Sequence, residues 1–148
     1  MSPLRSSICW RDALVAGAFA ALLSGIPSTL YAWATGGDVM EATRAAGAML
    51  IPATSAEREL VVAAALVHIS VSLFWTAVLV VLLPNKHIFI GSIVALALIA
   101  VLDLRVIGQL FPEIRALSFW PQFADHLAFG AVFGSVLAYR RQRRSASI

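Results

Sequence analysis

The sequence predicts an all-α membrane protein, a four-helix transmembrane bundle with a short amphipathic helix in the first outer loop. The first observation is composition: hydrophobic residues make up 60% of the 148 residues, and charged residues only 13%. Soluble domains average about 45–50% and about 25% for these classes, and a domain this small leaves much of its surface in water. The second observation is that the apolar residues fall into four windows, each near the roughly 20 residues that cross a bilayer.

This composition excludes several classes of protein. So few charged residues beside so many apolar ones exclude a soluble enzyme and a disordered protein. Cys9 is the only cysteine, so no internal disulfide framework can form. We therefore expect one integral membrane domain over residues 1–148, with the lipid bilayer as its surroundings.

The first two spans are predicted from windows that contain no charged residue. The first covers about residues 13–36, and the second covers about residues 60–83 and ends at Pro84. Pro27 lies inside the first window, where it predicts a kink, because a proline frees a backbone carbonyl that nearby hydroxyls can bind. The alternative for Pro27 is an unwound patch that lines a cavity, as transporters use.

The loop between these spans is expected to form a helix of its own. Asp38 followed by Glu41 is a capping-box pattern, and Pro52 ends the run Val39–Ile51 that follows. Such a helix would place Glu41 and Arg44 on one side and apolar residues on the other. We expect it to lie on the outer membrane surface or across the mouth of the bundle.

The last two spans both contain ionisable residues. The third covers about residues 88–111, the fourth covers about residues 121–139, and a basic tail over residues 140–148 follows. Because the fully charge-free part of the fourth window is short, a three-span protein remains the alternative.

The distribution of basic residues predicts the orientation. The termini and the connection between the second and third spans hold seven of the eleven lysines and arginines, while the other two connections hold three, together with five acids. The positive-inside rule therefore puts both termini in the cytoplasm. A basic tail beside anionic lipid explains the high sequence pI without nucleic acid as a partner. Removal of the first span as a signal peptide, at Ala32-Trp33-Ala34, is the alternative at the N-terminus.

Small residues predict close helix packing in two spans. Gly17, Ala21 and Gly25 repeat at every fourth position of the first span, and Gly130 and Gly134 form a GxxxG motif in the fourth. Small residues let helices approach closely where no hydrophobic effect acts between them. These faces can pack within the bundle, or they can join copies of the chain in a homo-oligomer or a larger membrane complex.

Polar residues inside the spans mark the candidate site, because ionisable groups are costly in hydrocarbon and by default functional. At about 1.5 Å per residue, they lie in the outer half of the bundle. Arg105 is expected to pair with Asp125, and Asp103 with His68, His126 or a hydroxyl of the first span. The complete predicted cluster is His68, Asp103, Arg105, Gln109, Asp125 and His126, with Ser28 and Thr29.

Three readings of this cluster are open. It can be a buried ion-pair network that fixes helix register, or an outward-facing pocket in which Asp103, His68 and His126 exchange protons or bind a ligand. In the third reading, His68 and His126 are the axial ligands of a b-type haem. No ExxH or HExxH pattern predicts a metal site, and no nucleophile constellation or nucleotide motif predicts a catalytic residue or a cofactor.

Several short motifs resemble small bacterial inner-membrane proteins of the YagU-like family. They are a histidine in the second span, prolines after the second and third spans (Leu83-Pro84 and Phe111-Pro112), and Asp125-His126-Leu127 with glycines downstream before an arginine-rich tail. The resemblance implies a bacterial inner-membrane location, and it carries over no catalytic residue.

Two functions are therefore expected, and neither is an enzyme. The first is a binding or transport protein that holds a small solute or a proton at the outer polar cluster. The alternative is a non-catalytic accessory or scaffold subunit that packs through its small-residue faces. The first predicts an open pocket bordered by His68, Asp103 and His126, and the second predicts that these groups are fully paired.

Overall fold

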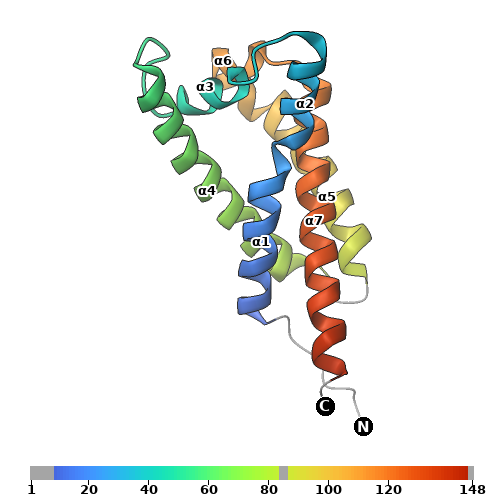
Figure 1. Ribbon diagram of the computed structural model, residues 1–148. Helices are drawn as coiled ribbons and strands as arrows, with labels where there is room; N and C mark the ends of the chain where they lie inside the picture. Colours follow the sequence, from blue (N-terminus) through green and yellow to red (C-terminus); the bar gives the residue numbers. More distant parts are fainter. Residues whose placement is uncertain (1–8, 84–86, 147–148) are drawn as a thin grey trace.

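The structure, a computed structural model, describes residues 9–83 and 87–146, and within them all regular secondary structure is helical. α1 (Trp10–Ser24) and α2 (Ile26–Thr35) form one interrupted helix, and the short α3 (Glu41–Gly47) follows at the same end of the molecule (Figure 1). α4 (Glu57–Leu82) then runs back along the molecule, with its N-terminal end tilted away from α2 (Figure 1). We call the end that holds α3 the upper end, and the end where α1 begins the lower end.

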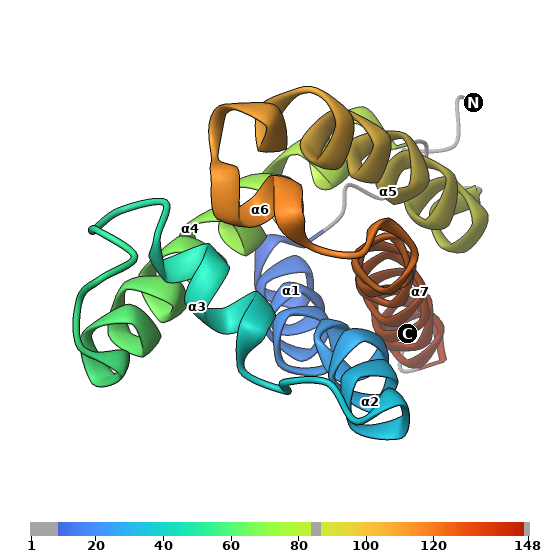
Figure 2. The ribbon, with the colours of Figure 1, turned by 90° about the horizontal axis from the view of Figure 1, so that it is seen from above.

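The second half of the chain rises and descends once more. α5 (Ile88–Arg105) rises, the 3-10 turn η2 (Ile107–Leu110) and α6 (Pro112–Ala116) cross the upper end, and α7 (Phe119–Ser145) descends to the lower end. α7 packs against α5, α1 and α2, whereas α4 packs against α1 and α3 and hardly touches α5 or α7 (Figure 2). α7 is therefore the central helix of the bundle, and α4 is a peripheral one.

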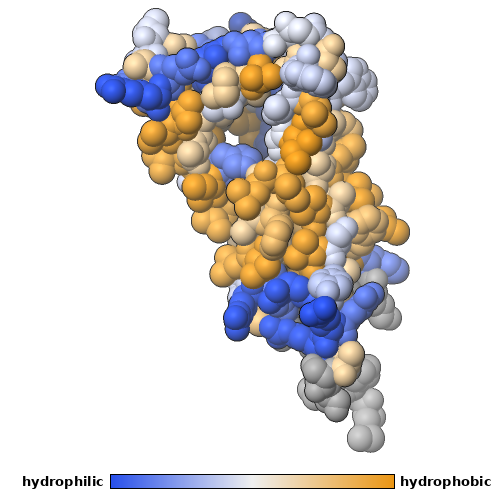
Figure 3. Space-filling view, in the orientation of Figure 1, coloured by the Kyte–Doolittle hydropathy of each residue, from blue (hydrophilic) through white to orange (hydrophobic). Residues whose placement is uncertain are grey.

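Three helical stretches are long and apolar enough to cross a membrane: Trp10–Thr35, Glu57–Leu82 and Ile88–Leu110. The surface has a broad hydrophobic band between two hydrophilic ends (Figure 3). Both features fit a membrane protein. α7 is longer than any of these stretches, but it carries Gln122 and two ionisable residues in its first half and is not among the three.

The predicted spans are found as helices, but their ends differ. The first helix begins at Trp10 and is interrupted at Gly25, and the third is α-helical only as far as Arg105. The last helix runs from Phe119 to Ser145, so most of the predicted tail is helical. A hydropathy window marks where lipid can surround a chain, whereas the ends of a helix depend on local backbone bonds. The last helix continues through the basic tail because arginine is a good helix former.

The helix in the first loop is shorter than predicted, covering Glu41–Gly47 instead of Val39–Ile51. The Asp38 carboxylate accepts the N–H of Met40 at 2.8 Å and so forms a tight turn ahead of the helix, rather than a capping box with Glu41. After Gly47 the backbone bonds shorten to three-residue spacing, which ends the α-helix.

An apolar core fills the lower half of the bundle. It is built from side chains of α1, α4, α5 and α7, and its largest fully buried member is Phe133 of α7. The buried cluster consists of Ala16, Ala20, Leu79, Ile88, Leu96, Ile99, Phe129, Phe133 and Leu137. This packing closes the lower half of the bundle with apolar side chains.

Glycines let the helices of this core touch backbone to backbone. A Cβ at Gly130 would lie 2.7 Å from the carbonyl oxygen of Ser92 on α5, and a Cβ at Gly134 would clash with the Ser92 hydroxyl. Ser92 is fully buried and donates its hydroxyl to the Gly130 carbonyl at 2.8 Å. Gly17 instead makes room for the side chain of Thr76 of α4. In this structure these glycines therefore pack within one chain.

A buried carboxylate joins the first and last helices, α1 and α7, at the lower end. Asp12, in the first turn of α1, is 2% exposed, and its two oxygens accept hydrogen bonds from Nε of Arg140 at 2.6 Å and Nε of Arg144 at 2.9 Å. The two arginines lie one turn apart on α7, so both reach the same carboxylate. We call this arrangement the Asp12 clamp. It was not predicted, because Asp12 served only as the edge of an apolar window.

Removing the Asp12 carboxylate should destabilise the bundle, because two arginines would then lose their shared partner. We expect Asp12→Ala to lower the free energy of unfolding by about 2–3 kcal/mol, less than for a fully buried pair since both arginines reach solvent. Thermal unfolding in detergent, followed by circular dichroism, measures this loss. Asp38→Ala, which breaks an exposed ion pair, is the matched control and should cost much less. Equal losses in the two variants would contradict the clamp.

Candidate functional site

The candidate site lies around the interruption between α1 and α2. Pro27 has no N–H to continue the helix, and the N–H of Gly25 turns to the carbonyl of Leu23. The Ala21 carbonyl and the Ser28 N–H therefore lack their usual helical partners. The interruption lies where Pro27 predicts a kink. Gly25 packs against no helix of its own chain, since nothing lies within 4 Å of a Cβ placed there, and packing between copies stays a prediction for this residue.

Asp125 of α7 caps the start of α2. Its Oδ1 accepts the N–H of Ser28 at 2.9 Å, at the end of the helix where the dipole favours a negative charge. The expected pair between Asp125 and Arg105 is therefore wrong. Arg105 instead places its guanidinium 4.3 Å from the centre of the Phe119 ring, because it lies at the last turn of α5 beside the first turn of α7.

His68 of α4 binds the other loose group of the interruption. Its Nε2 lies 2.8 Å from the Ala21 carbonyl oxygen, and because a carbonyl only accepts, Nε2 must carry the proton and donate it. The same carbonyl accepts the Ser24 hydroxyl at 3.3 Å. His68 is exposed, because α4 leans away from α2 at this level. Figure 3 shows that the surface beside α4 is hollowed below the upper rim.

His126 and Asp103 join α7 to α5. Nδ1 of His126 lies 2.9 Å from the Gln122 carbonyl oxygen and so donates to it, and Nε2 lies 3.3 Å from Oδ2 of Asp103. One further proton must lie between these two atoms, either on the imidazole or on the carboxyl. Both forms of the pair carry no net charge, which lowers the cost of placing it in apolar surroundings. His126 is thus one of the three partners expected for Asp103.

Three residues of the predicted cluster lie outside it. Arg105 and Gln109 are exposed at the upper end, and the Gln109 amide donates to the Leu104 carbonyl at 3.4 Å. Thr29 is exposed and donates its hydroxyl to the Gly25 carbonyl of its own helix at 2.8 Å. Four residues of the predicted cluster come from α4, α5 and α7, and each binds a defined partner. They are His68, Asp103, Asp125 and His126, and Ser28 of α2 is the partner of Asp125.

Axial ligation of a haem needs a ring nitrogen of each histidine with a free electron pair. Both nitrogens of His126 are hydrogen-bonded, whereas His68 binds a backbone carbonyl through Nε2 and keeps the electron pair of Nδ1. The b-type haem therefore stays a prediction. Within residues 9–83 and 87–146, no group of three or more His, Cys, Asp or Glu side chains could hold a metal ion.

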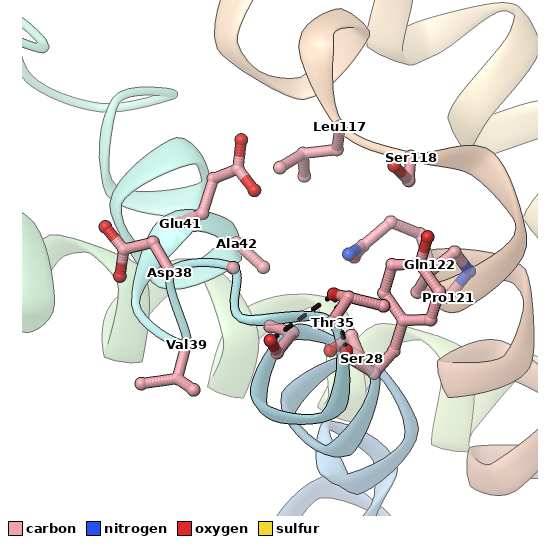
Figure 4. Close-up of a pocket in the computed structure, with 13 residues that line it drawn as sticks. Ser28, Thr35, Asp38, Val39, Glu41, Ala42, Leu117, Ser118, Pro121 and Gln122 are labelled. Atoms are coloured by element: carbon pink, nitrogen blue, oxygen red, sulfur yellow. Dashed lines mark hydrogen bonds between the residues drawn. The ribbon is translucent and has the colours of Figure 1, made fainter.

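A pocket of about 250 Å³ lies at the upper end, between α2, the start of α3 and the start of α7 (Figure 4). Its lining combines hydroxyl, amide and carboxylate groups with small apolar side chains, and it includes no lysine or arginine. The lining residues are Ser28, Tyr31, Ala32, Thr35, Gly37, Asp38, Val39, Glu41, Ala42, Leu117, Ser118, Pro121 and Gln122.

Glu41 is the acid that faces across the pocket. In Figure 4 its carboxylate reaches toward Leu117, whereas the Asp38 carboxylate points away from the other lining residues. Asp38 forms an ion pair with Arg44, and this guanidinium, together with the N–H of Met40, holds the pKa of the Asp38 carboxyl below its usual value. The charge of Asp38 is therefore already balanced, and Glu41 supplies the negative charge of the pocket.

The pocket borders the polar cluster without being formed by it. The open pocket expected from the sequence was to be bordered by His68, Asp103 and His126, and none of these lines this one. Ser28 and Gln122 line it instead, and they are the residues whose backbone atoms the cluster binds. Asp125 therefore positions the Ser28 part of the pocket wall from a neighbouring helix, whereas His126 binds a carbonyl of its own helix.

Cys9 is the N-cap residue of α1 and lies beside the Asp12 clamp. The N–H of Arg11 lowers the pKa of the Cys9 thiol most, followed by the Arg144 side chain and the N–H of Asp12. The thiolate is the reactive form of cysteine, and a helix N-terminus or a neighbouring arginine stabilises it. The sequence alone showed no such surroundings for Cys9, because Arg144 lies at the other end of the chain.

No protein-family model, no curated protein and no solved structure matches this chain. The resemblance to the YagU-like family therefore stays a prediction, and the chemistry of the site has to be argued from its own geometry.

The role of Asp125 as a cap predicts a difference between two substitutions. Asp125→Ala leaves the Ser28 N–H without an acceptor and should cost about 2 kcal/mol of unfolding free energy. Asp125→Asn keeps an oxygen in the same place and should cost less than about 1 kcal/mol. Chemical or thermal unfolding in detergent gives both values. A loss as large for asparagine as for alanine would show that the charge matters, and not the hydrogen bond.

The surroundings of Cys9 predict fast alkylation near neutral pH. The rate of reaction with iodoacetamide should rise with pH at a midpoint below that of a free thiol, and Arg144→Gln should move this midpoint upward, since it removes a positive charge beside the thiol. Arg140→Gln is the matched control, because it also weakens the Asp12 clamp but is not among the groups that act on Cys9. An equal shift in both variants would contradict the assignment.

Proposed function

We propose that the chain crosses the membrane four times with both termini in the cytoplasm, and that it binds a small neutral or cationic solute in the pocket at its upper, outer end. The protein then acts as a binding protein and not as an enzyme.

The aromatic side chains of α7 support a fourth span. Trp120 is 74% exposed near its start and Tyr139 is 54% exposed near its end. Nineteen residues separate them, which is about 28 Å of helix and matches the roughly 30 Å hydrocarbon layer. Trp33 and Trp10 are exposed at the two ends of the α1–α2 stretch. Tryptophan and tyrosine favour both membrane interfaces.

The central position of α7 explains its lower hydropathy. Its polar side chains turn toward other helices, where Asp125 caps α2 and His126 meets α5. A helix surrounded by protein needs fewer lipid-facing apolar residues than a peripheral one. The basic residues of the lower end support the cytoplasmic side for that end, by the positive-inside rule.

The observation that carries the binding function is the link between the pocket and the polar cluster. Ser28 of α2 lines the pocket, and Asp125 of α7 holds its backbone N–H across the contact between the two helices. A preorganised wall lowers the entropy lost when a ligand binds. An ionisable group that is costly inside a span thereby helps to shape the pocket.

The lining indicates the chemistry of the solute. Glu41 supplies negative charge, no basic side chain lines the pocket, and the C-terminal end of α2 at Thr35 adds a partial negative charge. Hydroxyl and amide groups can bind a polar solute, and an anion would be repelled. Because the lower half is filled by the apolar core, the structure supports a bound state that opens to the upper side only.

A thermal-shift assay in detergent tests this function with ethanolamine, choline, glycerol and lactate as probes. We expect at least one of the first three to raise the unfolding temperature by roughly 3–5 °C at ten times its Kd. Ala42→Trp, which fills the pocket, should abolish the shift, and Ala116→Trp, on the exposed end of α6, should keep it. Binding of lactate alone, or an unchanged shift in Ala42→Trp, would overturn the proposal.

A second candidate function is a non-catalytic accessory subunit. It is favoured by the fact that His68, Asp125 and His126 each have a partner on another helix, as structural ties would. In that case Asp103→Asn and His68→Ala would reduce folded protein without any effect specific to a ligand. Retained stability with lost ligand binding in these variants would instead favour the binding protein.

A further inference from the structure

The two ends of the described chain meet at one surface at the lower end. The Asp12 clamp holds the start of α1 beside the end of α7, so that Trp10 and Arg11 of α1 lie at the same end as Tyr139 and Arg143 of α7. Figure 3 shows hydrophilic side chains gathered at this end, directly below the hydrophobic band. We call this region the lower basic surface.

The lower basic surface carries a large excess of positive charge. Arg11, Arg140, Arg141, Arg143 and Arg144 face a single aspartate among the residues that the structure describes at this end. Asp12 can neutralise only one of these five charges. The remaining excess lies at the edge of the apolar band, where it attracts anions of the membrane surface.

Aromatic side chains set this charge at the depth of lipid headgroups. Trp10 and Tyr139 are 52% and 54% exposed, and such side chains favour the level where the hydrocarbon ends. The Arg143 guanidinium lies 5.1 Å from the centre of the Tyr139 ring, one turn nearer the membrane than its own backbone. This contact keeps the guanidinium close to the band, although a free arginine would extend into water.

We propose that the lower basic surface binds the phosphate group of an anionic phospholipid, with Arg11 and Arg143 as its cationic contacts and Trp10 and Tyr139 beside the glycerol and upper acyl region. Charge complementarity argues for a phosphate. The position beside the apolar band argues for a phosphate that carries acyl chains. The inference rests on the membrane embedding proposed above, but it is independent of the solute pocket at the other end of the bundle.

Native mass spectrometry of the full chain in detergent tests this proposal, with phosphatidylglycerol and phosphatidylcholine of the same acyl chains as probes. We expect phosphatidylglycerol to bind at least about tenfold more tightly, since each arginine near a membrane surface contributes about fivefold in affinity for anionic lipid. Arg11→Gln combined with Arg143→Gln should weaken phosphatidylglycerol binding on the order of 25-fold and leave phosphatidylcholine unchanged.

Arg58→Gln combined with Arg115→Gln is the matched control, because it removes the same charge from the upper end. It should keep the preference of the wild-type protein. Equal binding of the two lipids to the wild-type protein overturns the proposal, whether or not the glutamine variants fold. An equal loss in the control variant, or displacement of phosphatidylglycerol by an equal amount of glycerol 3-phosphate, overturns it as well. The second outcome would assign the surface to a soluble phosphate.

Discussion

The pairing of two backbone groups at the interruption between α1 and α2 is the constraint on which the upper half depends. In apolar surroundings an unpaired N–H or carbonyl costs several kcal/mol, and Pro27 leaves one of each near the middle of a long apolar helix. α7 supplies Asp125 to the Ser28 N–H, and α4 supplies His68 to the Ala21 carbonyl. The Asp125 carboxylate also has the sign that the dipole at the start of α2 favours.

This pairing has consequences for the neighbouring helices. α7 must present polar side chains to α2 and α5, which lowers its hydropathy and requires that it be surrounded by protein. α4 can supply its histidine and still remain at the periphery, with large apolar side chains such as Leu66 and Ile69 exposed on its outer faces. A single proline thus explains why two helices of the same chain differ so much in composition.

The two halves of the bundle are stabilised in different ways. The lower half combines the apolar core, the close approach of Gly130 and Gly134 to α5, and the Asp12 clamp. The upper half is held by single hydrogen bonds around a pocket and by ion pairs at the surface. Regions with few buried apolar contacts open at lower free energy than a core. We therefore expect the upper half to open at a lower free energy than the lower half.

Ionisable residues were easy to locate from the sequence and hard to pair. Asp103, Asp125 and His126 stand out because they interrupt apolar windows, but which of them meet depends on the rotation of each helix about its axis. A hydropathy pattern leaves this rotation undetermined, so Asp125 was assigned to Arg105 rather than to a backbone N–H. The pairing of Asp12 with Arg140 and Arg144 also depends on how two distant helices pack. The only signal of it in the sequence is that the two arginines lie one helical turn apart and can reach the same carboxylate.

Hydropathy and backbone bonding act over short stretches of chain, so the sequence is enough to predict the helical class, four apolar windows and the places of Pro27 and the ionisable residues. Three of the four windows form helices apolar enough to cross a membrane. Only the folded bundle shows that Ser28 and Gln122 line a pocket, that α7 is the central helix, and that α1 and α7 meet at Asp12. These features join residues far apart in the sequence. They depend on how whole helices pack and rotate against one another, which no local pattern encodes.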